Sequence, residues 1–365
     1  MTELNNINKA NKRSKERRQV LKSIRWNGYD DAVVVEALKT NQKNAWVVDR
    51  VNVSKDKVSF TKLSEQEQYQ YILTFVILSK IDALQGNIGM DILAENCTDS
   101  YVSCVFRYES GMEIVHSASY NKQIASLIST LEEERYIDIV DNSKEVADVV
   151  DFLIESMIDL DENFDISREV AFQLQLAYST ILESFLFYLF FYYPLYQANV
   201  KQRMNKCAEV IRLILRDESV HGAFSGYIFQ RESTKLSTEE NKFVSDTIAE
   251  FMSEMYKRIE NLLDFVYAEK HIREDIQHFA NYNFNRTLKN LGYEEVFEGE
   301  DIEFHTKVLE EVQDDIGVTM VHDIFSMTGK VYFMMESQPY NEKNKLNVSK
   351  KIEARHSLTP PLRIK

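Results

Sequence analysis

Glu113-Ile114-Val115-His116 and Glu218-Ser219-Val220-His221 are two copies of one short pattern, and they decide the fold of this chain. Both lie in stretches with strong helical character. On a helix, side chains three positions apart project from one face about a turn apart, so each Glu/His pair can offer one oxygen and one nitrogen to a single cation. Each copy therefore predicts half of a metal site.

Each copy follows an acidic residue that lies in a separate apolar segment. Asp82 is thirty-one residues before Glu113, and Glu183 is thirty-five residues before Glu218. The pattern therefore predicts, twice over, a helix with one carboxylate followed by a helix with a Glu-x-x-His pair. This ligand set is typical of ferritin-like di-iron and di-manganese bundles. We expect an all-α, ferritin-like helical bundle with a dinuclear metal site between four core helices.

A third Glu-x-x-His shows why one copy alone would be weak evidence. Glu353-Ala354-Arg355-His356 lies in a polar, basic segment that ends in Pro360 and Pro361, where no buried bundle is expected. The other two copies lie among apolar residues, where charged groups rarely stay unless they are paired or bound to a cation. The alternative interpretation is surface carboxylates beside hydrogen-bonded histidines, or structural ion pairs.

The composition favours long helices, and the cysteines indicate a reducing compartment. The 365 residues can bury a large core, and they include only ten Gly and four Pro, with no proline before Pro194. A formal charge of -15 argues against direct nucleic-acid binding and suits a soluble, cytoplasmic protein. The three cysteines, Cys97, Cys104 and Cys207, have no C-x-x-C spacing, so neither a zinc site nor a disulfide framework is expected.

No membrane-spanning or targeting segment is expected. The most apolar stretch, residues 181–196, is too short to span a bilayer and contains Glu183, so a buried central helix explains it better. The basic amino terminus has no apolar run like that of a signal peptide. The expected organisation is a flexible basic arm over residues 1–20, a ferritin-like helical domain over 21–335 and a flexible tail over 336–365.

Apolar periodicity places the motifs on successive helices. Ser64 and Glu67 have the spacing of a capping box at the start of the helix that carries Asp82, and that helix is expected to run past Gly86 and Gly89 with close packing or local distortion there. Further helices are predicted over residues 30–44, 101–130, 144–158, 167–194, 202–230, 237–270 and 272–291.

Tyr120 is the second informative residue. It lies four positions after His116 and seven after Glu113, so the three side chains share one helical face and the phenol is expected beside the metals. A redox metal pair that activates oxygen can oxidise a nearby phenol by one electron, provided that water is kept away. The apolar neighbours expected to exclude water are Phe187, Phe191, Ile211 and Ile214. The alternative is an ordinary buried tyrosine with a hydrogen-bonded hydroxyl.

Four stretches make the chain resemble the small, radical-generating subunit of class I ribonucleotide reductase, and most of all the class Ib form. They are Ile81-Asp82-Ala83-Leu84-Gln85-Gly86-Asn87, Glu113-Ile114-Val115-His116 with Ser119-Tyr120, Leu182-Glu183-Ser184-Phe185-Leu186-Phe187-Tyr188, and Leu215-Arg216-Asp217-Glu218-Ser219-Val220-His221. The resemblance covers roughly residues 30–340. It implies that Tyr120 is the radical site and that two iron or two manganese ions are bound. The ligands that it implies are Asp82, Glu113, His116, Glu183, Glu218 and His221.

The resemblance also implies a route for the electron. Trp46 and Asp217 match the tryptophan and aspartate that connect the metal site to the surface in such subunits. Asp217 could accept a hydrogen bond from the Trp46 indole or from the free ring nitrogen of His116. Without the resemblance, Trp46 would be interpreted as core packing. Tyr340 is the candidate for the tyrosine in the tail that completes the route, and Tyr332 is its rival.

The implied function is that of an oxidoreductase, the small subunit of ribonucleoside-diphosphate reductase. It would assemble a dinuclear metal and tyrosyl-radical cofactor and pass the radical to the large catalytic subunit for deoxyribonucleotide synthesis. The chain has no Gly-rich phosphate loop of the usual type, which fits this division of labour. The resemblance further implies a homodimer, and a flavodoxin-like activator for a manganese form.

One feature departs from the family and three alternatives stay open. The carboxyl-terminal tail of this family is usually acidic, whereas the tail of this chain is basic. Two interpretations of the tail therefore stay open: it docks on the large subunit, or it has another role. The basic residues are Lys343, Lys345, Lys350, Lys351, Arg355, Arg363 and Lys365.

Another di-iron oxidase, such as a desaturase or hydroxylase, would share the ligands without needing Tyr120, Trp46 and Asp217. A ferritin-like storage protein should be shorter, and a helical scaffold would not explain two matched repeats.

Overall fold

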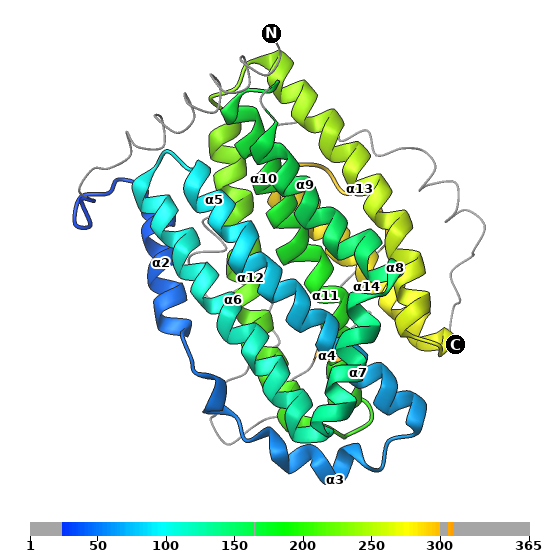
Figure 1. The fold of residues 1–365 in the computed structure, drawn as a ribbon. Helices are drawn as coiled ribbons and strands as arrows, with labels where there is room; N and C mark the ends of the chain where they lie inside the picture. Colours follow the sequence, from blue (N-terminus) through cyan, green and yellow to red (C-terminus); the bar gives the residue numbers. More distant parts are fainter. Residues whose placement is uncertain (1–23, 164, 300–305, 310–365) are drawn as a thin grey trace.

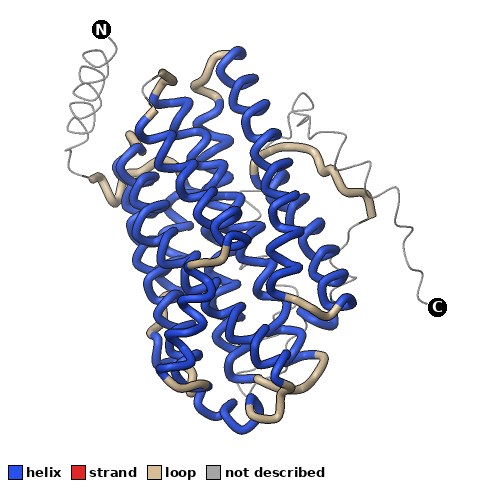
Figure 2. The backbone as a smooth tube through the Cα atoms, turned by 45° about the vertical axis from the view of Figure 1, so that its right-hand side comes forward, coloured by secondary structure: helices blue, strands red, loops and turns tan. Residues whose placement is uncertain are grey.

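The computed structural model describes residues 24–163, 165–299 and 306–309, and throughout this part of the chain the regular elements are helices, without a strand (Figures 1 and 2). The α-helices are α2 (Ala32–Asn44), α3 (Lys57–Phe60), α4 (Glu65–Leu84), α5 (Met90–Asn96), α6 (Ser100–Leu127), α7 (Thr130–Asp141), α8 (Lys144–Val146), α9 (Phe152–Glu162), α10 (Arg168–Ile181), α11 (Phe187–Asn199), α12 (Asn205–Ser233), α13 (Thr238–Val266), α14 (Lys270–Asn290) and α15 (Thr306–Leu309). Short 3₁₀ turns cover Val48–Arg50 and Val53–Asp56. The predicted all-α architecture is confirmed, while the predicted boundaries after residues 20 and 335 lie outside the described residues.

Side-chain caps explain where several helices begin. Ser64 caps α4, and its hydroxyl and the Glu67 carboxylate each bond the other residue's backbone N–H, as the capping-box spacing predicts. Asp31 and Asp99 cap α2 and α6 in the simpler way, each with a carboxylate oxygen that accepts backbone N–H bonds from the first turn. These caps satisfy backbone donors that would otherwise have no partner within the helix.

The centre of the bundle is the long helical stretch formed by α10 and α11. Figure 1 shows it in the middle, with α2 and α6 on one side and α13 on the other. Every residue from 170 to 199 is buried. The stretch is long and apolar enough to cross a membrane, yet its most apolar window is entirely covered by the rest of the protein, so it is a core helix, as predicted.

Two predicted details of the helices were wrong. The helix that carries Glu183 does not end at Pro194 but continues to Asn199, because packing on all sides outweighs the single backbone hydrogen bond that a proline removes. Helix α7 was missed. Only Val140 on this helix is buried, and Tyr136 and Ile139 beside it are partly buried against the core, so its apolar face is short, and a capping box of Ser129 and Glu132 marks its start.

Two π-helical turns interrupt the helices that carry single carboxylates. Gln85–Gly89 joins α4 to α5 just after Asp82, and Leu182–Leu186 joins α10 to α11 and contains Glu183. A third, Ala147–Asp151, lies away from them between α8 and α9. Such turns add a residue to the helical repeat, re-aim the side chains that follow and often mark functional sites. The expected distortion at the glycines after Asp82 is therefore present.

Packing between four helical stretches brings the carboxylates together. Helix α4 packs against α6, α11 packs against both α12 and α4, and α12 also packs against α10. The residues that carry the two predicted half-sites thus lie on neighbouring elements at the middle of the bundle. This arrangement is what a buried site between four helices requires.

Candidate metal centre

Six side chains converge at the middle of the bundle, and all six are fully buried. Asp82 comes from α4, Glu183 from the π-helical turn Leu182–Leu186, and each Glu-x-x-His pair from its own helix, α6 or α12. They are the six residues that the sequence predicted: Asp82, Glu113, His116, Glu183, Glu218 and His221. The structure therefore brings together every one of the predicted ligands.

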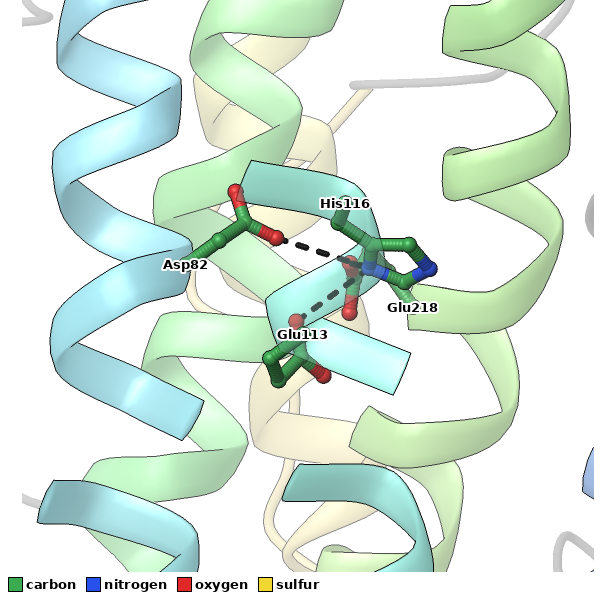
Figure 3. Close-up of side chains that lie close together, drawn as sticks. All are labelled: Asp82, Glu113, His116 and Glu218. Carbon is green, nitrogen blue, oxygen red and sulfur yellow. Dashed lines mark hydrogen bonds and ion pairs between the residues drawn. The ribbon is translucent and has the colours of Figure 1, made fainter. Parts of the chain in front are cut away.

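The first group gathers around Nδ1 of His116, as Figure 3 shows. This nitrogen lies 2.8 Å from Oε1 of Glu218, 3.2 Å from Oε2 of Glu113 and 3.4 Å from Oδ1 of Asp82. All four residues offer a donor atom toward one point. Three carboxylates and one imidazole of this kind form one potential cation position.

The second group gathers around Nδ1 of His221. This nitrogen lies 2.7 Å from Oε1 of Glu113, 3.1 Å from Oε2 of Glu218 and 3.9 Å from Oε2 of Glu183. The two groups therefore share two carboxylates, because Glu113 and Glu218 each direct one oxygen to His116 and the other to His221. Asp82 belongs to the first position only and Glu183 to the second only. The geometry is that of two adjacent cation positions bridged by two carboxylates.

The electrostatics of the group fit positive charge at its centre. Burial, reinforced by neighbouring carboxylates, raises the pKa values of Asp82 and Glu183 well above their ordinary range. Burial would also raise the pKa of Glu113, but the adjacent His221 and His116 outweigh it and hold that pKa low. Oδ2 of Asp82 accepts no hydrogen bond from any described residue. Four buried carboxylates are costly without cations, and oxygen with imidazole donors suits iron or manganese.

The bundle supports the ligands through Gln85 and two close backbone approaches. Nε2 of Gln85 donates to Oε1 of Glu183 at 2.5 Å and to Oγ of Ser179 at 3.0 Å, which orients the Glu183 carboxylate on the π-helical turn. A Cβ atom on Gly86 would lie 3.0 Å from Cβ of Glu113, and one on Gly222 would lie 3.2 Å from Cβ of Glu183. Glycine at both positions thus lets the helices approach closely enough for the ligands to meet.

Tyr120 lies on α6, the helix that carries Glu113 and His116, in a fully buried position. Its hydroxyl has no hydrogen-bond partner among the described residues, and its ring centroid lies 6.0 Å from that of Phe75. Burial, with the nearby carboxylates of Asp82 and Glu218, raises the pKa of Tyr120 well above its ordinary value. The side chain is therefore a neutral phenol in a dry, acidic setting. The ordinary alternative, a buried tyrosine whose hydroxyl is hydrogen-bonded within the protein, does not describe it.

Asp217 connects the metal centre to Trp46. Its Oδ2 accepts a hydrogen bond of 2.8 Å from Nε1 of Trp46 and lies 3.3 Å from Nε2 of His116. Its Oδ1 accepts from the guanidinium of Arg216 at 3.0 and 3.1 Å. The sequence left the partner of Asp217 open between the indole and the imidazole, and the structure gives it both. Because Nδ1 of His116 faces the carboxylates, the contact at Nε2 orients the ring.

Several residues of the centre were missed from the sequence. Glu109 is fully buried one helical turn before Glu113, and its Oε1 accepts a hydrogen bond of 2.9 Å from Nδ2 of Asn41 on α2. Burial raises the pKa of Glu109 to about 8. Helical spacing could have found Glu109, four positions before Glu113, and likewise Gln85, three after Asp82.

Other predicted residues have mixed outcomes. The residues expected to exclude water, namely Phe187, Phe191, Ile211 and Ile214, are all fully buried. The aromatic ring in contact with Tyr120 is Phe75, which the sequence analysis did not single out and which lies seven positions before Asp82. Tyr340, its rival Tyr332, the third Glu-x-x-His and the basic tail lie outside the described residues.

Comparison with known proteins agrees with this geometry. Residues 23–304 match the family model described as ribonucleotide reductase, small chain. The chain is 30% identical over 310 residues to ribonucleoside-diphosphate reductase subunit beta nrdF2 of Mycobacterium tuberculosis, an alignment that covers 85% of this chain and 92% of the relative.

Solved structures agree as well. The dimanganese(II)-NrdF of Streptococcus sanguinis superposes with a TM-score of 0.69 and 27% identity, over 76% of this chain and 94% of that one. An R2-like ligand-binding oxidase superposes with a TM-score of 0.60 over 75% of this chain and 97% of that one, at 13% identity, which shows a shared fold alone. The predicted ferritin-like fold is confirmed, and the chain belongs to the ribonucleotide reductase small-chain family.

Proposed function

We propose that this small subunit of ribonucleoside-diphosphate reductase holds two iron or two manganese ions at the bridged centre and uses Tyr120 as its radical site. The observation that carries the proposal is the position of Tyr120, fully buried and one helical turn beyond His116, with no hydrogen-bond partner among the described residues. The proposed ligands are Asp82, His116, Glu183 and His221, each at one position, with Glu113 and Glu218 at both.

When bound, such a metal pair supplies a one-electron oxidant beside the phenol. The residues around Tyr120 then decide how long a radical survives. The raised pKa keeps the phenol protonated before it is oxidised, so removing an electron also releases a proton. Full burial keeps water and reductants away from the ring, and the absence of a hydrogen-bonded partner removes an easy source of hydrogen atoms.

The same residues connect the centre to the partner subunit. The Trp46 indole stacks near the His116 ring, with centroids 5.9 Å apart, and both contact Asp217. Trp46 is only partly buried, so this chain of contacts reaches toward the surface. We propose that the hole passes along it and then through Tyr340 to a cysteine on the large subunit, where ribonucleotides are reduced.

Members of this family work with a large subunit and as dimers, so both partners are inferred for this chain. The proposal adds a flavodoxin-like activator that would supply the oxidant to a manganese form. It includes no direct nucleic-acid or membrane contact and places the protein in the cytoplasm. The strong negative charge and three unpaired cysteines support that placement.

Another di-iron oxidase, of the desaturase or hydroxylase kind, is the weaker alternative. It would use the same ligands, and the likeness to the R2-like oxidase is a likeness of fold. It gives no reason for the contacts that join Trp46, Asp217 and His116. A ferritin-like storage protein gives none for these contacts either.

Replacement of Tyr120 by Phe tests the proposal. The metal-loaded Tyr120→Phe protein should keep its metal content, lose the tyrosyl signal in low-temperature electron paramagnetic resonance and lose nucleotide reduction with the large subunit. Tyr293→Phe is the matched control, because Tyr293 is also buried but its hydroxyl bonds to Ser245 away from the centre. Undiminished nucleotide reduction by Tyr120→Phe would refute the radical role, and metal analysis of the same samples identifies the ions.

A further inference from the structure

The three most exposed large apolar side chains among the described residues lie at one end of the bundle. They are Val47, Val58 and Leu131, which are 68%, 66% and 70% exposed. Single apolar residues scattered over a surface are ordinary, whereas a group of them on one face indicates a partner. The metal centre uses none of the three, so the group needs an explanation of its own.

Contacts with the last turns of α6 place the three residues at the same end. The 3₁₀ turn Val48–Arg50, next to the first apolar residue, is joined to α6 by an ion pair between Asp49 and Lys122. Lys57 on α3, next to the second, donates a hydrogen bond to the backbone carbonyl of Leu127 at the end of α6. The third lies in the first turn of α7, which follows directly. Figure 1 shows α3 and the chain around it along the lower end of the bundle.

The segment that joins α2 to α4 across this end is basic in a strongly acidic chain. Residues 43–62 contain five basic side chains and two acidic ones, whereas the whole chain has a formal charge of -15. Of the two acidic side chains, Asp49 is in the ion pair with α6 and Asp56 is buried. Acidic side chains of α7 lie only at the edge, in its first turn. The exposed basic residues of the segment include Lys43, Arg50, Lys55 and Lys62.

Trp46 indicates which partner fits this face. Its partly buried indole is the outermost group of the contacts that lead from His116 through Asp217, and the exposed Val47 follows it directly in the chain. Electron transfer slows steeply with distance, so the next group of the route must lie against this part of the surface. A second copy of the chain would bring the basic segment against itself across a two-fold axis, where like charges repel.

We propose that the large subunit docks on this end of the bundle, packs apolar side chains against Val47, Val58 and Leu131, and places acidic side chains opposite residues 43–62. The inference rests on the proposed route through Trp46. The face extends along the last eleven positions of α6, which is about 16 Å at about 1.5 Å per residue. This extent fits within a standard interface, which buries about 800 Å² on each partner.

Binding of the metal-loaded full chain to the large subunit from the same source tests the proposal. The double variant Val58→Ser with Leu131→Ser should bind about tenfold more weakly, because two apolar contacts are lost. Lys55→Glu should bind about threefold more weakly at low ionic strength, and this deficit should shrink as salt screens the charges. At saturating large subunit, nucleotide reduction should recover in both, because Trp46 and Asp217 are unchanged.

Phe243→Ser and Lys242→Glu are the matched controls for these changes. Both residues are exposed near the start of α13, at the opposite end of the bundle in Figure 1. One control removes an exposed apolar side chain and the other reverses an exposed charge, as the test variants do. Both controls should bind the large subunit as tightly as the wild type. Metal content and melting temperature show whether each variant is folded.

The outcomes separate this inference from the function beneath it. If the wild type forms no tyrosyl signal, the radical role of Tyr120 fails, whereas binding can still be measured. If the test variants bind as tightly as the wild type and the controls, the docking face is overturned even when the radical forms. Normal binding with poor activation by a flavodoxin-like protein would assign the face to the activator, and loss of a dimer would assign it to a second copy. Either result overturns the proposal.

Discussion

Asp217 accepts the Trp46 indole N–H at 2.8 Å on the same oxygen that lies 3.3 Å from Nε2 of His116. One carboxylate oxygen thus orients a ring that can reach the surface and a ring that faces the metal centre. Arg216 holds the other oxygen of Asp217 and also donates to the backbone carbonyl of Asn44, near the end of α2. The arrangement fixes α2 and Trp46 against α12.

Replacement of Asp217 by Asn should impair radical transfer between the metal centre and the large subunit. The amide has only one acceptor oxygen, so it cannot accept from the Trp46 and His116 rings, which now share Oδ2, and from Arg216, which donates to Oδ1, at the same time. We expect nucleotide reduction to fall about 10- to 100-fold, the usual cost of losing such an outer contact. The tyrosyl signal should persist at saturating metal. Asp246→Asn, at an exposed ion pair with Lys242, is the control, and equal activity in both variants would contradict the role.

Gly222 should tolerate no side chain. A Cβ atom there would lie 2.1 Å from Oγ of Ser184 and 3.3 Å from its Cβ, and Asn290 holds that hydroxyl with a hydrogen bond of 2.9 Å. Gly222→Ala should lower the free energy of unfolding by about 1–3 kcal/mol, the usual range for overpacking. Metal affinity should fall with it, because the displaced turn carries Glu183.

Gly111→Ala is the matched control for that prediction. Gly111 lies on α6, the helix that carries Glu113 and His116, but a Cβ atom there would meet nothing within 4 Å. This change should stabilise the protein by up to about 1 kcal/mol through helix propensity. Denaturant unfolding of the metal-free proteins measures both changes, and a Gly222→Ala variant as stable as Gly111→Ala would refute the close packing.

Glu109→Gln should change how stability depends on pH. The pKa of Glu109 is raised from 4.5 to about 8 in the folded protein, so in that window only the unfolded chain releases the proton. The contribution of this bound proton to the free energy of unfolding is fully present below pH 4.5 and is lost as the pH rises toward 8. Between pH 6 and 7.5 the metal-free wild type should lose about 2 kcal/mol relative to Glu109→Gln. Thermal melts at several pH values measure this difference, and parallel profiles would contradict it.

Metal ions should stabilise the fold through the bridged carboxylates. At a free metal concentration about one hundred times the dissociation constant, one site adds about 3 kcal/mol to the free energy of unfolding. A chelator should therefore lower the melting temperature of the wild type and of Tyr120→Phe alike. Glu218→Gln should show a much smaller shift, because Glu218 contributes an oxygen to both positions. An equal shift in Glu218→Gln would count against the bridging role.

The helices could be predicted where an apolar face or a cap marks them. The start of α4 follows from Ser64 and Glu67, and the buried α10–α11 stretch follows from its continuous apolar residues. Helix α7 was missed because its apolar face is short: only Val140 is buried, with Tyr136 and Ile139 partly buried beside it. The end of α11 was misplaced because the effect of Pro194 depends on packing that the local sequence does not show.

The sequence by itself determined which residues form the centre. Helical spacing puts Glu113 and His116 on one face, and the apolar surroundings of Asp82 and Glu183 require a reason for charge in the core. Both inferences rest on local geometry and on the cost of burial, which do not depend on how the helices pack.

Only the tertiary structure decided the roles of the individual side chains. Glu113 and Glu218 contact both imidazoles because α6 and α12 bring their Glu-x-x-His faces together, whereas Asp82 contacts only His116. The pairing of Glu109 with Asn41, and the contact of the Tyr120 ring with Phe75, likewise depend on residues far apart in the chain. Distances of this kind are set by helix packing and π-helical turns, and no spacing along the sequence encodes them.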